Sequence, residues 1–107
     1  MKNTKMEKNC VLTNMLKTNL DIVNRHIDVL KILQMKQPIG VTELAEKTKY
    51  PRHKVAYSLT VLEEEGLIEP SIGGAITTEN IDDIIKRLKD NIIDVNIAYN
   101  ELLKKLE

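Results

Sequence analysis

A short basic segment near the middle of the chain carries the residues best suited to binding a ligand. It runs from Lys47 to Lys54 and holds four cationic side chains and no acidic one. Lysine and arginine bind phosphate oxygens, and the planar arginine side chain can also donate two parallel hydrogen bonds to one acceptor. The segment therefore predicts a surface for a phosphate-bearing partner. The four cations are Lys47, Lys49, Arg52 and Lys54.

Other residue types that carry chemistry are isolated from one another in the sequence. Cys10 is the single cysteine, so it can form neither an intrachain disulfide nor a zinc site by itself, and it favours a reducing, cytoplasmic setting. His26 and His53 fall on different predicted helices, and we expect His26 to be a surface or boundary residue. There is no Ser-His-Asp grouping and no glycine-rich phosphate loop. We therefore expect no catalytic residue, no metal and no cofactor, and a protein that is not an enzyme.

The composition fits one small domain with one appended element. Of the 107 residues, 42% are apolar and 30% are charged, so a core and a well-solvated surface are both expected. Three tyrosines with no Phe or Trp mean that the core must be aliphatic. The 16 basic and 16 acidic residues cancel, so attraction for a polyanion depends on how the charges are distributed. No stretch approaches the roughly 20 apolar residues of a membrane span, so no membrane partner is expected.

The first part of the chain is predicted to hold a tail and two helices. Residues 1–7 are expected to be a flexible tail, and residues 8–17 a short helix. The sequence Thr18-Asn19-Leu20-Asp21 has the form of a capping box that would begin a second helix. Apolar residues then recur every three or four positions up to Gln37-Pro38, where the proline ends the helix.

The middle of the chain predicts two further helices. Thr42 is expected to cap a short helix from Glu43 to Lys49. Tyr50-Pro51 then separates it from a helix over Arg52 to Glu65, because proline is tolerated at a helix start. Gly66 is typical of the position just past a helix end.

A β-hairpin is predicted after this helix. Leu67 to Ser71 and Ala75 to Thr78 are expected to be its strands, and Gly73-Gly74 its two-residue turn. The fold class that follows is mainly α with a small β-hairpin and a long C-terminal helix.

The last helix gives the strongest periodic signal in the sequence. Thr78 or Asn80 is expected to cap it, and it is predicted to run to about Leu106. Its apolar residues alternate in spacings of four and three, which is typical of a coiled coil. We therefore predict a homodimer held by this helix, parallel or antiparallel, with the N-terminal helix covering the rest of the apolar stripe. The predicted interface residues are Ile81, Ile85, Leu88, Ile92, Val95, Tyr99, Leu102 and Leu106.

The segment from Val41 to Pro70 resembles the helix-turn-helix and wing entry of the winged helix-turn-helix transcriptional regulators of bacteria and archaea. The resemblance rests on Thr42-Glu43-Leu44-Ala45, on Val55, Leu59 and Leu62, and on Glu65-Gly66-Leu67-Ile68. It implies a winged helix-turn-helix domain and a regulator that binds double-stranded DNA, with the third helix in the major groove. The domain division that follows is a tail and short helix over residues 1–18, a winged domain over residues 19–78 and a dimerisation helix over residues 79–107.

The resemblance also implies which residues contact DNA. Arg52 and Tyr57 are the expected base-reading residues, whereas Lys49, Lys54 and Ser58 are expected to contact phosphates. The full expected set is Lys49, Arg52, His53, Lys54, Ala56, Tyr57, Ser58 and Thr60.

Two features depart from that family and leave a second interpretation open. The expected wing tip, Ser71-Ile72-Gly73-Gly74, has no cation, so it is not expected to reach the minor groove. Glu63, Glu64 and Glu65 would repel phosphate, so only the first half of the third helix is expected to enter the groove. The alternative is a winged helix that makes protein contacts as a subunit of a larger complex, its basic segment being a solvated face.

Overall fold

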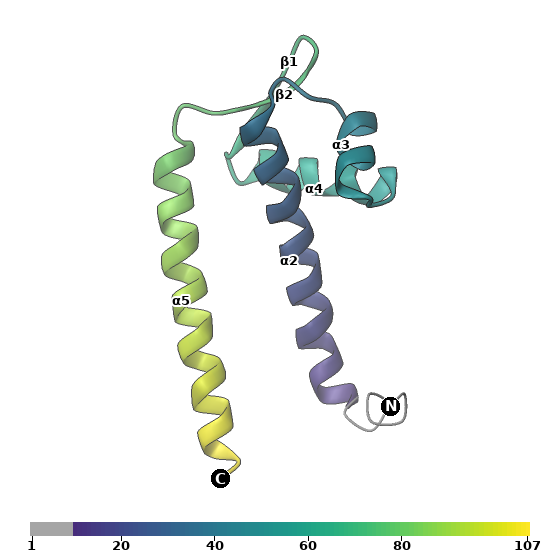
Figure 1. The fold of residues 1–107 in the computed structure, drawn as a ribbon. Helices are drawn as coiled ribbons and strands as arrows, with labels where there is room; N and C mark the ends of the chain where they lie inside the picture. Colours follow the sequence, from purple (N-terminus) through teal and green to yellow (C-terminus); the bar gives the residue numbers. More distant parts are fainter. Residues whose placement is uncertain (1–9) are drawn as a thin grey trace.

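The computed structural model describes residues 10–107, which form four helices and one β-hairpin (Figure 1). The predicted tail at residues 1–7, and the beginning of the helix predicted over residues 8–17, lie outside this range. The described chain is mainly helical with a small antiparallel hairpin and a long C-terminal helix, so the coarse fold prediction is confirmed. In chain order the elements are α2 (Val11–Met35), α3 (Val41–Thr48), α4 (Arg52–Glu64), β1 (Ile68–Ser71), β2 (Gly74–Thr77) and α5 (Ile81–Lys105).

One continuous helix, α2, takes the place of the two helices expected at the start of the chain. It begins after Cys10 and passes through residue 18 without a break, so the capping box predicted at Thr18 is wrong. A cap forms only where the preceding backbone leaves the helical conformation, and neither glycine nor proline occurs between residues 11 and 35. Lys17 and Asp21, one turn apart, form an ion pair at 3.6 Å across the expected break. The division of the chain drawn at residue 18 therefore falls inside a helix.

The short helix α3 starts and ends through backbone geometry. It begins at Val41 after Gly40 and has no side-chain cap, so the cap predicted at Thr42 is wrong. Lys49, predicted to be helical, instead adopts a left-handed conformation with φ of 69° and ends the helix. This turn directs the chain from α3 into α4.

Helix α4 lies close to its predicted limits. Pro51 precedes it with φ of −60°, a value that suits a helix start, and the helix ends at Glu64. Gly66 follows with φ of 83°, the left-handed conformation expected of a glycine past a helix end. The N–H of Leu67 donates to the carbonyl of Leu62 at 3.0 Å, which closes the helix end and leads into the hairpin.

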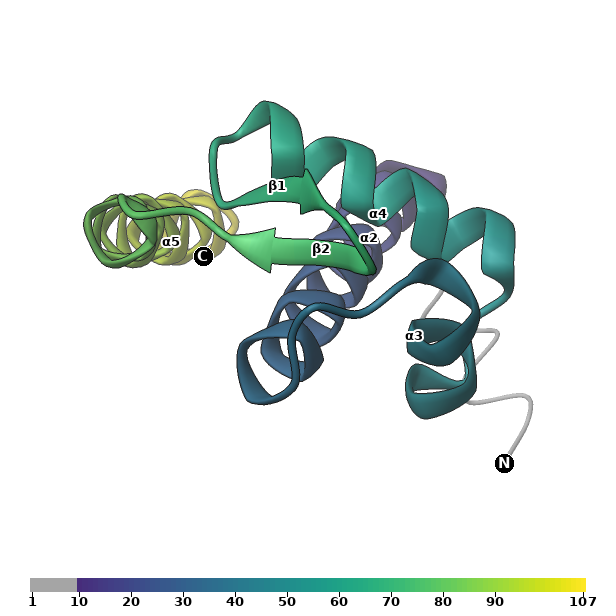
Figure 2. The same cartoon turned by 90° about the horizontal axis from the view of Figure 1, so that it is seen from above.

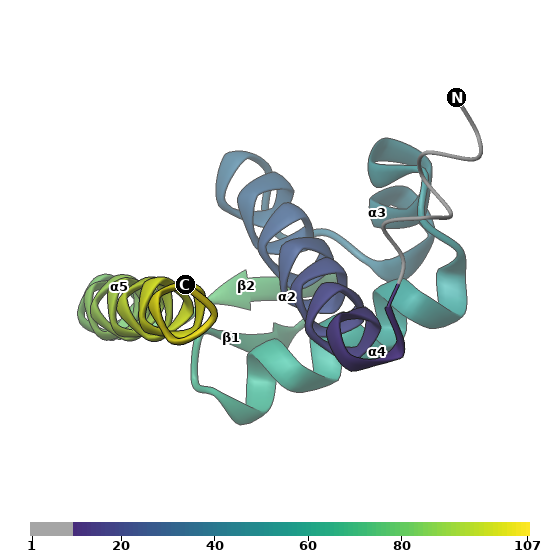
Figure 3. The ribbon, with the colours of Figure 1, turned by 90° about the horizontal axis from the view of Figure 1, so that it is seen from below.

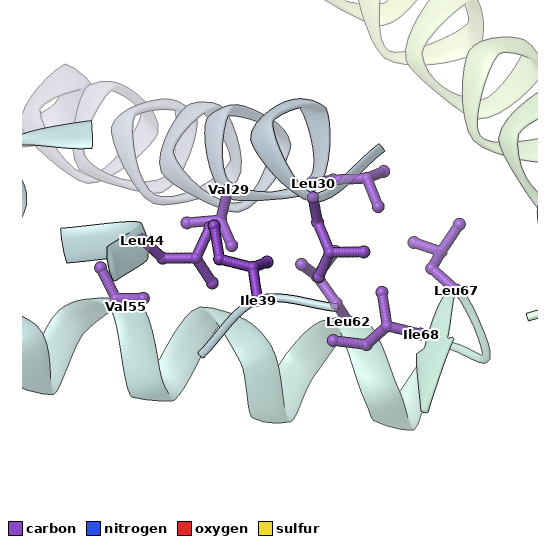
Figure 4. Packing of buried hydrophobic residues seen from close by; sticks show 9 residues of the cluster. Val29, Leu30, Ile39, Leu44, Val55, Leu62, Leu67 and Ile68 are labelled. Atoms are coloured by element: carbon purple, nitrogen blue, oxygen red, sulfur yellow. The ribbon is translucent and has the colours of Figure 1, made fainter. Parts of the chain in front are cut away.

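The core lies where the end of α2 meets α3, α4 and the hairpin (Figure 4). Only the last third of α2 contributes fully buried side chains, and they point toward α3 and α4. Every apolar member of this core is aliphatic, as the composition predicts. The buried apolar residues are Val29, Leu30, Leu33, Ile39, Leu44, Val55, Leu62, Leu67 and Ile68.

The hairpin turn lies one residue earlier than predicted. The strands pair antiparallel from Ile68 with Thr77 to Ser71 with Gly74, so Ile72-Gly73 is the turn rather than Gly73-Gly74. Gly74 is a paired strand residue, and it must be glycine because a side-chain carbon there would come within 2.4 Å of the Ile39 carbonyl carbon. The two glycines therefore meet different needs: Gly73 turns the chain with φ of 94°, and Gly74 allows a close approach.

The segment after α2 fixes the hairpin to the core. The N–H of Ile39 donates to the Ala75 carbonyl at 3.3 Å, and the N–H of Ala75 donates to the Ile39 carbonyl at 2.9 Å. The side-chain oxygen of Gln37 accepts the Thr77 N–H at 2.7 Å. The hairpin is thus held by hydrogen bonds on one edge as well as by its buried residues.

Helix α5 touches the core only with its first turns and then extends away from it, in the direction opposite to α2 and without packing closely against that helix (Figures 1 and 3). Ile81, Ile84 and Ile85 pack against the core, yet no residue of α5 is fully buried. Viewed from above, the hairpin lies between α5 and α3 (Figure 2). Within residues 10–107, no helix is both long and apolar enough to cross a membrane.

The caps predicted for α5 are wrong. Asn80 precedes the helix without a side-chain capping bond. The Thr78 hydroxyl instead donates to the Gly66 carbonyl at 2.6 Å, which ties the end of the hairpin to the end of α4.

The close approach at Gly74 predicts a strong effect of a single methyl group. We expect Gly74→Ala to lower the free energy of unfolding by about 2 kcal/mol or more, because the position combines backbone strain with a clash against Ile39. The matched control is Gly40→Ala, since φ there is −104° and nothing lies within 4 Å of the added carbon. Urea denaturation measures both. Equal stability of the two variants would contradict the hairpin geometry described above.

Candidate nucleic-acid interface

The outer side of α4 gathers most of the residues predicted to contact DNA. Val55, Ser58 and Leu62 define the buried side of this helix. Seven of the eight predicted residues are exposed, on the turn before α4 or on the helix itself, and Tyr57 has 55% of its surface exposed. The exposed seven are Lys49, Arg52, His53, Lys54, Ala56, Tyr57 and Thr60.

Charge is distributed unevenly along α4. Arg52 and Lys54 lie in its first turn, and Lys49 lies on the turn before it, all exposed. Glu63, Glu64 and the following Glu65 lie at the opposite end and are exposed as well. A polyanion would be attracted to the start of the helix and repelled from its end.

Ser58 is a correction to the predicted site. It is fully buried, so it cannot contact a phosphate from outside the protein. Its hydroxyl oxygen accepts a hydrogen bond from Arg25 Nε at 3.2 Å and lies 2.7 Å from Nδ1 of His26. Ser58 therefore joins α4 to α2 from the inner side. Its spacing of three from Val55 and four from Leu62 is the signal that could have placed it there.

His26 is partly buried, as expected of a boundary residue, and its ring lies against the inner side of α4. Since Arg25 donates to the Ser58 oxygen, the Ser58 hydroxyl is free to donate to Nδ1 of a neutral His26. Burial, and then the charge of Arg25, lower the pKa of His26. The ring centre also lies 5.7 Å from that of Tyr57, in a tilted arrangement. His26 thus touches a residue that emerges on the outer side of α4.

A second hydrogen bond positions the turn that leads into α4. The Tyr50 hydroxyl donates to an Asp28 carboxylate oxygen at 2.7 Å. This bond, followed by burial, raises the pKa of Tyr50. The ring also packs against the core. Arg25, His26 and Asp28 were not among the predicted site residues. Arg25 and His26 nevertheless lie four and three residues before the buried Val29, and Asp28 lies four residues before Ile32, which packs against the core.

Comparison with known proteins gives no identification. The chain matches no protein-family model, and no curated protein is significantly similar to it.

The hairpin tip carries no charge, as the sequence indicates. Ile72 at the turn is 99% exposed. The Ser71 hydroxyl donates to the Gly74 carbonyl at 2.6 Å across the turn. The tip therefore presents the apolar Ile72 side chain on a turn that is closed by a hydrogen bond. It has no cation that could bind a phosphate.

Metal-ligating side chains do not converge in the part of the chain that the structure describes. Within residues 10–107 there is no group of three or more His, Cys, Asp or Glu residues arranged to hold an ion. Cys10 is exposed at the start of α2.

The partly buried His26, with its lowered pKa, predicts a pH-dependent stability. Its pKa in the folded chain lies below the ordinary value of 6.5, so below that value the unfolded chain binds a proton more readily than the folded chain. The stabilising contribution is therefore complete above the ordinary value and is lost as the pH falls through the folded pKa. We expect the free energy of unfolding to drop as the pH is lowered from about 7.5 to about 5.

The control for this prediction is His26→Gln, whose side chain stays neutral throughout and can still accept a hydrogen bond. Urea denaturation at several pH values should give a shallower pH dependence for this variant than for the wild type. If the two proteins lose stability in parallel, His26 is not the group responsible.

Proposed function

We propose that this protein is a sequence-specific DNA-binding transcriptional regulator with a winged helix-turn-helix domain. The observation that carries the proposal is the exposed start of α4, where the segment Lys47–Lys54, which contains no acidic residue, presents its cations on a helix that is packed from behind. Duplex DNA is the partner whose phosphates and base edges suit such a surface. We expect the protein to act in the cytoplasm, where the DNA of a bacterial or archaeal cell lies.

The arrangement of the helices supports this proposal. The major groove admits one α-helix, and a helix can be held there only if other elements fix its angle. Here α2 and α3 both pack against α4, and the hairpin follows it directly. This order of elements supports the proposed winged helix-turn-helix. The outer side of α4 is left exposed for a partner.

The exposed residues divide into two roles. Arg52 is suited to donate two hydrogen bonds to guanine, and Tyr57 to contact a base edge or thymine methyl group. Lys49 and Lys54 flank them and are suited to phosphate oxygens, which fix position without reading sequence. The remaining members of this surface are His53, Ala56 and Thr60.

A winged helix that binds a protein partner is the second candidate. The observation that favours it is the almost fully exposed Ile72 at an uncharged hairpin tip, on a chain with no net charge. A DNA-binding wing more commonly offers arginine or lysine to the backbone. The two candidates differ in salt dependence, because only binding to DNA phosphates releases many counterions.

Fluorescence anisotropy with a duplex selected from genomic fragments tests the first candidate. Arg52→Ala should cost about 1–3 kcal/mol of binding free energy and relax discrimination between bases. Lys49→Ala should weaken binding to all sequences alike and lower the slope of log affinity against log salt by about 1.

Lys89→Ala is the control, because this exposed lysine lies on α5, which does not pack closely against α4. It should leave both affinity and salt slope unchanged. A wild-type protein that binds no genomic fragment at low salt would refute the regulator and favour the protein-binding candidate.

A further inference from the structure

Two helices project together from the core and form an arm. We define the arm as residues 11–23 of α2 and residues 92–106 of α5, which run in opposite directions (Figure 1). The arm makes the molecule elongated, with principal extents of 53 × 32 × 19 Å. The radius of gyration is 16.7 Å, whereas a compact domain of this length has about 13 Å.

The arm carries most of the large exposed apolar side chains of the described chain. They come from both helices, which do not pack closely against each other, so both leave an apolar side open. Those of α2 are Val11, Leu12, Met15, Leu16, Leu20 and Val23, from 39% to 90% exposed, and those of α5 are Ile92, Ile93, Val95, Ile97, Leu102, Leu103 and Leu106, from 46% to 85% exposed.

The exposed area is larger than a compact monomer would leave. The chain exposes 8354 Å² at 12.2 kDa, whereas a compact monomer of that mass exposes about 6,100 Å². Residues 1–9 could expose at most about 1,500 Å², and this area is subtracted first. The area that remains exceeds that of a compact monomer of the remaining mass by about 1,200 Å². Each partner in a standard protein interface buries about 800 Å². The excess is therefore sufficient for a stable interface.

We propose that a second copy of this chain covers the arm, so that two arms form an antiparallel four-helix bundle. Two helices alone cannot enclose an apolar core, whereas four can. A second copy supplies the two missing helices with the same apolar spacing, and a two-fold axis makes the surfaces complementary to themselves. The prediction from sequence held the dimer by the last helix and used the N-terminal helix only to cover the rest of its apolar stripe; the present proposal gives α2 an equal share.

Charge along the arm part of α5 selects the antiparallel orientation. Asp94 lies near the start of this part, and Lys104 and Lys105 lie at its end. When residues 92–106 of two copies overlap in opposite directions, the basic end of one copy lies beside Asp94 of its partner. In a parallel pair like charges would meet, which is unfavourable.

Sedimentation equilibrium of the full chain at micromolar concentration tests the proposal. The wild type should have twice the monomer mass of 12.2 kDa. Met15→Asp on α2 and Val95→Asp on α5 should each halve the mass, because each places a charge in the bundle core. Both side chains are more than half exposed in the single chain, so circular dichroism should still report a helical protein.

Ile72→Asp is the matched control, since Ile72 is the most exposed apolar residue outside the arm. It should remain a dimer. A monomeric wild type overturns the proposal. If Met15→Asp is still a dimer, α2 is not part of the interface. If Ile72→Asp is a monomer, the interface lies at the hairpin instead.

The single cysteine measures the orientation in the wild-type sequence. Cys10 is exposed and lies at the free end of the arm (Figure 1), so a spin label there reports the distance between the two arm ends. An antiparallel bundle should separate the two labels by about 20 Å or more, since the arm residues of α2 rise about 1.5 Å each. A distance of about one helix diameter, roughly 10–12 Å, where the ends meet, rejects the antiparallel arrangement.

These measurements need no DNA, so they can fail separately from the proposed function. A protein that binds DNA as a monomer overturns the bundle and leaves the regulator standing. A dimer that binds no DNA supports the bundle and overturns the proposed regulator.

Discussion

The packing of the end of α2 against α4 is the contact on which the rest of the structure depends. Val29 and Leu33 of α2 and Val55 of α4 are fully buried, and each such side chain contributes roughly 1.5–3 kcal/mol when removed from water. Arg25 and His26 add hydrogen bonds to Ser58 on the same side of α4. These contacts occupy the inner side of α4 and fix its direction. Its outer side, with the basic first turn, is consequently the part left to meet a partner.

Helix α2 belongs to two parts of the molecule at once. Its last third lies in the core, and its first half lies in the arm, with no glycine or proline between them. A continuous helix behaves as a stiff rod, so whatever covers the arm also fixes where α4 lies. In the proposed dimer, the spacing of the two α4 helices is therefore set by rigid elements. The hairpin is held just as firmly, through its bridge to Ile39 and the close approach at Gly74.

The order of the elements could be predicted because periodic apolar spacing reports burial directly, as in α4 and α5. Local motifs were less reliable, since Thr18 has a capping sequence but the helix around it simply continues. Ser58 was assigned to phosphate by its residue type, although its spacing from Val55 and Leu62 placed it inside. The hydrogen bonds of Arg25 and His26 join residues more than 30 positions apart, which local periodicity cannot report. The hairpin turn was displaced by one residue because the need for a glycine against Ile39 is a tertiary constraint.

The most direct test of the central claim, that the outer side of α4 binds DNA, is an NMR titration of the labelled full-length protein with duplex DNA at low salt. Amide shifts map the surface of contact without relying on a substitution. We expect the largest changes at Lys49 and from Arg52 to Tyr57, with small changes in the second half of α5. Changes confined to the arm or to the hairpin tip, or no changes at all, would contradict the account.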